Sequence, residues 1–171
     1  MANTTFSGPV ISKNGFTTTG PGTTVSLTAD TTLTVKSHAG RILLCNDADG
    51  VFTLPTINAN ANGASAGETD YNNQNNIGAS FYFYVETLAT AIKITTDGTD
   101  KFKGAAMVAV DDGNKKAFIP GATNDAIDLN GTTKGGLVGS VIQVTAIDTN
   151  SYLVHNTLLL GSGTIVTPFG N

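Results

Sequence analysis

Hydrophobic and polar residues alternate along short stretches of this chain, with the period of two that is typical of a β-strand with one buried face. In residues 32–36, for example, Leu33 and Val35 alternate with threonine and lysine. No stretch has the sustained period of a helix. The pattern therefore predicts an all-β fold.

The alternation in residues 80–85 predicts the strongest strand of the chain. Its residues Phe81, Phe83 and Val85 would share one face, and Tyr82 and Tyr84 the other. Because both faces are aromatic, we expect one face to build the core and the other to meet a second sheet or another subunit.

Residues 31–55 predict three strands separated by two turns. The strand at 32–36 is followed by the apolar run 41–45, whose length suits a strand that is covered on both sides. Asp49-Gly50 is expected to close a hairpin, because glycine supplies a positive φ. The returning strand at 51–54 ends at Pro55, which has no N–H to donate.

The remaining strands recur about every 8 to 12 residues, as they do in a sandwich or barrel. The turns at 111–113, 130–131 and 148–151 predict hairpins, the last of them long and C-terminal. We expect strands at residues 24–28, 91–95, 105–110, 116–119, 126–129, 141–147 and 152–160, and a last strand or tail at 164–171.

The chain divides into an extended N-terminal arm, residues 1–23, and a single β domain, residues 24–171, which is sandwich- or barrel-like. The arm consists mostly of threonine, glycine, asparagine and proline. Alone, it would lose more chain entropy than its few apolar groups return. We therefore expect it to dock on a neighbouring molecule; folding back onto its own domain is the alternative. Its anchors would be Phe6, Val10, Ile11 and Phe16.

The segment 57–79 predicts a long surface loop, because it is rich in asparagine and poor in apolar residues. Tyr71 is its one expected packing anchor and a candidate for binding at an exposed surface. Together with Tyr82 and Tyr84, this loop could form a carbohydrate site, since sugar sites on β-domains use exposed aromatic side chains beside asparagine. A role of the same tyrosines in the core or at an interface fits equally well.

Composition narrows the possible partners. The 171 residues have a net charge of −4 with only nine lysines and arginines, which argues against a nucleic-acid partner. No run approaches the roughly 20 apolar residues of a membrane span, and residues 1–16 do not resemble a signal peptide. We expect no membrane partner and a protein made in a cytoplasm. The single cysteine, Cys45, is expected to be buried and inert.

Candidate chemistry is sparse in this sequence. His38 and His155 are far apart along the chain, and no nucleophile motif accompanies them. Residues 46–50 have a superficial likeness to a calcium loop, but a turn explains them better, because the ligand positions do not match. Glu68 and Asp70 are better explained as solvated surface residues. We expect no catalytic residue, no cofactor and no metal, and hence not an enzyme.

Several turn-and-strand motifs occur in an order that resembles a family of small structural proteins of tailed-phage particles, especially those of short-tailed marine and cyanobacterial phages. The likeness spans nearly the whole chain, although the asparagine-rich segment after Pro55 is longer than the family pattern would have. The motifs are Ser7-Gly8-Pro9-Val10, Asn14-Gly15-Phe16, Leu33-Thr34, His38-Ala39-Gly40-Arg41, Thr53-Leu54-Pro55, Ile92-Lys93-Ile94, Phe102-Lys103-Gly104, Leu129-Asn130-Gly131-Thr132-Thr133, Gly136-Leu137 and Thr167-Pro168-Phe169.

The resemblance implies a capsid decoration (cement) protein, made in the host cytoplasm and located on the capsid surface of the virion. It would bind the major capsid protein as an oligomer, a homotrimer, and clamp the shell with its N-terminal arms. The alternative is a head-fibre or tail-associated β-module that binds a carbohydrate or receptor, such as a host-surface glycan. Three classes of protein therefore stay open: a structural component of the virion, a carbohydrate- or receptor-binding protein, and an enzyme.

Overall fold

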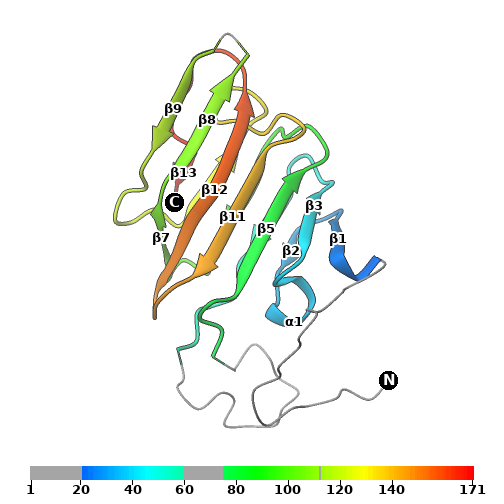
Figure 1. Ribbon diagram of the computed structural model, residues 1–171, viewed down its shortest axis with the longest axis vertical. Coiled ribbons are helices and arrows are strands. Elements are labelled where there is room, and N and C mark those ends of the chain that lie inside the picture. The colour runs from blue at the N-terminus through cyan, green and yellow to red at the C-terminus, as the bar shows by residue number, and fades with distance from the viewer. Residues whose placement is uncertain (1–20, 60–74, 112) are drawn as a thin grey trace, which may run out of the picture.

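Two mixed β-sheets form the body of the protein (Figure 1), which confirms the predicted all-β, sandwich-like fold. The computed structural model describes residues 21–59, 75–111 and 113–171. Most of the predicted arm lies outside the described residues, as does the middle of the loop 57–79.

The larger sheet has eight strands. Seven of them lie in one path, and β7 (Lys101–Gly104) pairs with the first half of β12 beside that path. The path runs β1 (Thr24–Leu27), β3 (Ile42–Cys45), β5 (Ser80–Val85), β11 (Val141–Ala146), β12 (Ser151–Gly161), β8 (Ala106–Val110) and β9 (Lys115–Phe118).

The smaller sheet has five strands and lies behind the larger one in Figure 1. Helical structure in the described residues is limited to the 3-10 helix η1 (Pro21–Thr23) and the single turn α1 (Val35–His38). The strand order in this sheet is β13 (Phe169–Gly170), β10 (Ala126–Leu129), β6 (Ile92–Thr95), β4 (Val51–Thr53) and β2 (Thr31–Thr32).

The first six strands alternate between the two sheets. In the larger sheet β1, β3 and β5 are parallel neighbours, and in the smaller sheet β2, β4 and β6 are parallel neighbours. The chain therefore winds as a flattened coil. Each strand lies beside the strand two places earlier in the chain, in the same sheet. Because parallel neighbours cannot be joined by a tight turn, each connection must cross to the other sheet.

This winding shows that the hairpin predicted at Asp49-Gly50 is wrong. The flanking strands β3 and β4 lie in different sheets, and Gly50 does not adopt a positive φ. The residue at position 50 is a glycine because of packing: a Cβ there would lie 2.8 Å from Cζ of Phe52. The hairpin predicted at Asn130-Gly131 is also wrong, because the strands on either side, β10 and β11, belong to different sheets.

Two further predictions around residue 40 fail. The strand expected at 32–36 ends at Thr32, and residues Val35–His38 form a helical turn that the Thr34 hydroxyl caps by accepting the Ser37 N–H at 3.3 Å. The run 41–45 is covered on one face only: Leu43 is fully buried, whereas 41% of Ile42 is exposed. The short strand β7 was not predicted at all.

Aromatic side chains join the two sheets. Phe52 of β4 and Phe83 of β5 are fully buried, and their rings stack with centroids 6.3 Å apart. Tyr152 of β12 is also fully buried, and its hydroxyl donates to the Pro55 carbonyl at 2.5 Å, so its polar end is satisfied. The predicted alternation is confirmed, because Phe81, Phe83 and Val85 share one face of β5, and the structure shows that this face builds the core.

The predicted C-terminal hairpin is confirmed, since β11 and β12 pair antiparallel. The register shifts between Val141 and Gln143, where β12 has a bulge at Asn156 with φ +47°. Asparagine tolerates this left-handed conformation better than most residues, and its amide donates to Gln143 Oε1 at 2.8 Å. The bulge lets one long strand pair with β7 along its first half and with β8 along its second.

The contact between Gly104 and β12 provides a stability test. Gly104 has φ +96°, and a Cβ there would lie only 2.2 Å from the Val154 carbonyl oxygen. Gly98 has a similar φ of +88° but open space around it, so Gly98→Ala is a matched control. We expect Gly98→Ala to lower the free energy of unfolding by about 1 kcal/mol and Gly104→Ala by at least about 3 kcal/mol. Urea denaturation measures the free energy of unfolding of both variants. Equal losses would contradict the close approach of Gly104 to the Val154 carbonyl.

Candidate functional site

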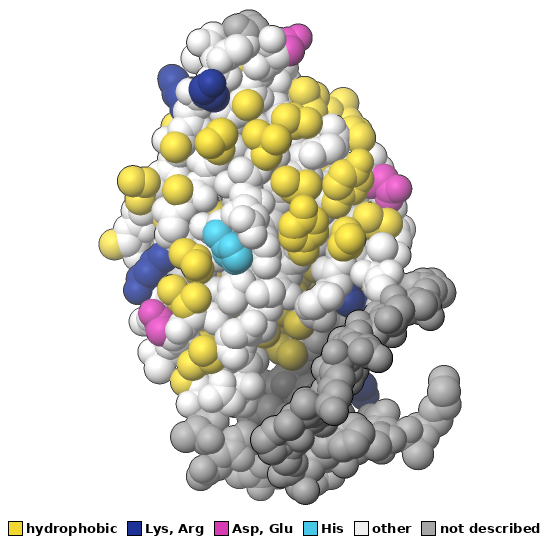
Figure 2. Space-filling view, in the orientation of Figure 1, with side chains coloured by type: hydrophobic (Ala, Val, Ile, Leu, Met, Phe, Trp, Pro, Cys, Tyr) yellow, Lys and Arg dark blue, Asp and Glu magenta, His cyan; other side chains and the backbone are white. Residues whose placement is uncertain are grey.

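The outward side of the larger sheet is free of charge over five neighbouring strands. Strands β1, β3, β5, β11 and β12 contain no Asp, Glu, Lys or Arg. Apolar side chains gather over this side of the molecule, and the charged side chains lie toward its periphery (Figure 2). We call this side of the larger sheet the outer face.

Large apolar residues lie next to one another across the outer face. Strand register places Ile42 beside Tyr82, Leu44 beside Tyr84, Tyr84 beside Val141, and Val141 beside Leu158. Ile42 and Leu158 are each 41% exposed, and the others are half-buried. We call these six residues the apolar patch: Ile42, Leu44, Tyr82, Tyr84, Val141 and Leu158.

Polar residues without a formal charge border the apolar patch. Gln143 pairs in register with Tyr82 on one side and His155 on the other. The His155 ring nitrogen Nε2 contacts the Thr145 hydroxyl at 2.9 Å. These groups can form hydrogen bonds with a partner and do not add the desolvation cost of an ion.

An open hollow adjoins the outer face at the far end of β12. It measures about 290 Å³, and Ala109, Leu137 and Leu160 contribute apolar side chains to its lining. Met107 of β8, 43% exposed, extends the apolar surface on this side. The hollow suits a protruding apolar side chain better than a polar ligand.

The two histidines lie in separate elements, each in contact with a threonine. In α1, the His38 Nδ1 accepts the Thr34 N–H at 2.9 Å, and burial lowers the pKa of His38. His155 lies on β12 in contact with Thr145. The structure therefore does not bring the two rings together in one site.

Residues 46–50, which have a superficial likeness to a calcium loop, connect β3 and β4 in the two sheets. The Asn46 amide donates to Ser26 Oγ at 2.7 Å and to Glu86 Oε2 at 2.6 Å, which ties three chain segments together. Within residues 21–59, 75–111 and 113–171, no group of three His, Cys, Asp or Glu side chains is placed to hold a metal ion. The neighbouring Cys45 is buried as predicted, and burial raises the pKa of its thiol to about 12.

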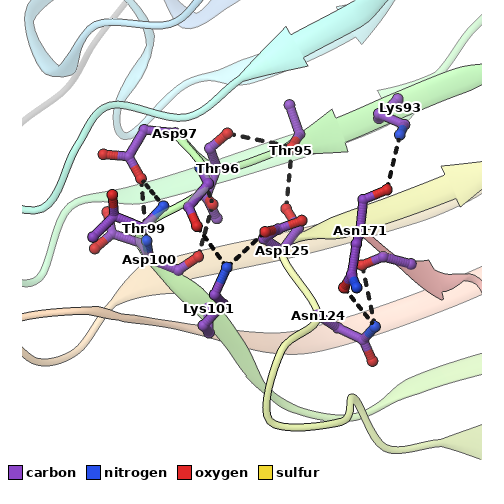
Figure 3. A network of polar contacts seen from close by, with 12 residues as sticks. Lys93, Thr95, Thr96, Asp97, Thr99, Asp100, Lys101, Asn124, Asp125 and Asn171 are labelled. Carbon is purple, nitrogen blue, oxygen red and sulfur yellow. Dashed lines mark hydrogen bonds and ion pairs between the residues drawn. The ribbon is translucent and has the colours of Figure 1, made fainter.

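A polar network connects the turn after β6 with the C-terminal end of the chain (Figure 3). Lys101 Nζ donates to Asp125 Oδ2 and to the Gly98 carbonyl, both at 2.6 Å. Within the turn, Asp97 Oδ1 accepts the backbone N–H groups of Thr99 and Asp100. These contacts fix the turn that leads into β7, so the network has a structural role.

Asp100 extends this network to the start of the loop 57–79. Its Oδ2 accepts the Ile57 N–H at 2.8 Å, and burial together with the nearby Asp97 and Asp148 raises the pKa of Asp100. The other end of the loop is held by Asn76, whose amide accepts from Asn58 N and donates to the Thr56 carbonyl. Both ends of the loop are thus anchored at one place.

The predicted binding residues have different outcomes. Phe6, Val10, Ile11, Phe16 and Tyr71 lie outside the described residues, so their roles stay predictions. Tyr82 and Tyr84 lie on the face opposite Phe81 and Phe83, as the alternation of residues 80–85 predicts, and the structure shows that this face points outward.

The sequence did not single out the other members of the apolar patch. Residues 41–45 were expected to be buried on both faces, which assigned Ile42 and Leu44 to the core. One feature of the sequence indicates their position on the outer face. Their strand contains no charged residue and has large apolar side chains on both of its faces. That pattern is shared by strands within a core and strands in an interface.

Comparison with protein-family models, with curated proteins and with solved structures finds no match to this chain. No helix in the described part of the chain has the length and apolar composition needed to cross a membrane.

Replacing Asp100 tests the electrostatics of the network. Because its pKa is raised above the ordinary 3.8, the folded state binds the proton more tightly, so stability from this group is full at low pH and is lost as the pH rises through the raised pKa. Asparagine can still accept the Ile57 N–H. We expect Asp100→Asn to cost more stability at pH 4 than at pH 7, measured by urea denaturation.

Asp148 supplies a control of opposite sign. The Asn150 N–H lowers the pKa of this exposed carboxyl, so its contribution is present at neutral pH and is lost as the pH falls. Asp148→Asn should therefore cost more at pH 7 than at pH 4. The same pH trend in both variants would contradict the opposite directions of the pKa shifts of Asp100 and Asp148.

Proposed function

We propose that this protein is a structural component of a tailed-phage particle: a decoration (cement) protein that binds the outside of the capsid and stabilises the shell. It acts as an oligomer, a homotrimer as the family resemblance implies, with the major capsid protein as its partner. It has no enzymatic role. The observation on which the proposal depends is the broad, uncharged outer face of the larger sheet.

The outer face supports a role in assembly because of its size and composition. Apolar patches this continuous on a protein surface mark sites of protein association. Its tyrosines and branched aliphatic residues are typical of the buried centre of an interface, and the charges of both signs near its edges are typical of a rim.

The body is also suited to a mechanical role. The two sheets are joined by buried aromatic rings and by the Tyr152 hydroxyl bound to the Pro55 carbonyl, so they pack as one body, as a mechanical role requires. The last residues of the arm, Pro21–Thr23, form η1 and lead into β1, which lies at the edge of the larger sheet. In this proposal the arms of one oligomer grip neighbouring capsid subunits, so that several weak contacts give durable binding.

Deleting residues 2–16 tests the clamp. These residues precede η1, so we expect the truncated protein to fold with the circular dichroism spectrum and the thermal midpoint of the full chain. Its binding to purified heads of the phage that encodes it should fall by at least about tenfold, as judged by co-sedimentation. Wild-type occupancy of the truncated protein on heads would refute the clamp.

Carbohydrate binding is the second candidate function, and the outward position of Tyr82 and Tyr84, with Gln143 beside Tyr82, favours it. Partly exposed aromatic rings can stack on sugars, and the Gln143 amide can form hydrogen bonds with their hydroxyl groups. In this alternative the protein is a head-fibre or tail-associated module that recognises a host-surface glycan.

A glycan array separates the two functions. If the second is correct, a defined glycan should bind, and Tyr84→Ala should weaken that binding by about tenfold, since loss of an aromatic stacking partner costs roughly 1–2 kcal/mol. Tyr71→Ala tests the loop in the same assay. If no glycan on the array binds the wild-type protein, the glycan alternative is contradicted and the structural function is retained.

A further inference from the structure

We infer that the outer face of the larger sheet is the contact surface between copies of this chain, with the apolar patch at its centre. The inference rests on the proposed function, which requires an oligomer, and deepens it by naming the surface that the copies share. The arms are then free to bind the capsid.

Charge is the first argument for a second copy as the occupant. Each chain has a net charge of −4, so two copies repel one another on average. Strands β1, β3, β5, β11 and β12 contain no Asp, Glu, Lys or Arg, so copies that meet here bury no ion and leave no like charges opposed. A surface that contacts its own copy must not place like charges opposite one another, and the outer face meets this condition.

Polar groups at this surface can be satisfied in a contact between copies. Gln143 and His155 lie next to each other on adjacent strands, between Tyr82 and the edge of β12. They provide donors and acceptors that can pair with the tyrosine hydroxyls of the other copy. Because each copy brings both donors and acceptors, such a set can pair across a contact between copies in a dimer or a trimer.

The area of the outer face is the second argument. From β1 to β8 the sheet has six adjacent strands, and a strand spacing of about 4.8 Å makes it about 29 Å wide. Strands of about five residues, at about 3.3 Å per residue, give a height of about 17 Å. Two such faces together cover about 1,000 Å² of flat area, which is about the size that a biological interface should reach. Sheets also pack face to face readily, at about 10 Å.

Leu158 and Val166 provide a matched pair of variants. Both are 41% exposed, but Leu158 belongs to the apolar patch, whereas Val166 lies in the segment that leaves β12 for β13 in the other sheet. We expect wild-type protein to have a mass of two or three times the 17.5 kDa chain in light scattering. Leu158→Lys should raise the dissociation constant between copies at least about tenfold, and Val166→Lys should leave it unchanged.

Folding is checked for each variant by circular dichroism and thermal midpoint. If Leu158→Lys does not fold, Ile42→Thr decides, because threonine retains the β-branch of isoleucine and removes apolar surface from the patch. It should also weaken self-association. A monomeric wild-type protein overturns the inference, and so does an equal loss in the Val166→Lys variant.

Other occupants of the outer face give distinct outcomes. If the protein is monomeric and deletion of residues 2–16 makes it self-associate, its own arm covers the face and the inference is wrong. If Leu158→Lys leaves the mass unchanged but abolishes co-sedimentation with heads, the capsid is the occupant and the inference is again wrong. Conversely, a wild-type oligomer that Leu158→Lys dissociates supports the inference even where no head binding is found, so the proposed function can fail separately.

Discussion

The structure depends on the burial of aromatic rings between two sheets that the chain visits in turn. Phe52 and Phe83 lie on consecutive strands of the coil, one in each sheet, and their stacked rings join the layers directly. Such a pair adds about 0.5–1.5 kcal/mol to the free energy that burial alone provides. Because β4 and β5 are consecutive strands in different sheets, this contact holds the two layers together at that point. The parallel neighbours on either side then follow from the repeated winding.

A consequence of this arrangement is that the two faces of the larger sheet have different roles. The inward face supplies the core, as Leu43, Phe81, Phe83, Ile142 and Val144 are fully or almost fully buried. The outward face uses residues of similar size and hydrophobicity, although nothing in the described residues forms a third layer over it. A strand such as β5, aromatic on both faces, is costly to expose to water. That cost explains why the outer face is the strongest functional signal in the molecule.

The sequence predicts most strands of this protein but only some of their connections: the antiparallel pairs β8–β9 and β11–β12 follow predicted turns, whereas Asp49-Gly50 and Asn130-Gly131 do not form hairpins. Alternation locates residues 80–85, 141–147 and 152–160 because each is long enough to show a period of two. It fails at Val35–His38, where a single helical turn capped by Thr34 is too short to show its own period. Asp49-Gly50 has the composition of a hairpin turn, but the long-range pairing of β3 with β1 and β5 decides where β4 lies. The apolar patch was missed for a related reason: burial of one face or both depends on layers that a local pattern does not contain.

The anchoring of the loop 57–79 has an evolutionary consequence. Asn76 binds Thr56 and Asn58 through three hydrogen bonds, and Asp100 holds Ile57, so the ends of this loop are closed by contacts of their own. The number of residues between the two ends is therefore uncoupled from the register of β4 and β5. Closure entropy rises only slowly with length, so the chain can lengthen, shorten or change composition here at little thermodynamic cost. The fold can thus accommodate changes in the length and composition of this segment while the body is inherited unchanged.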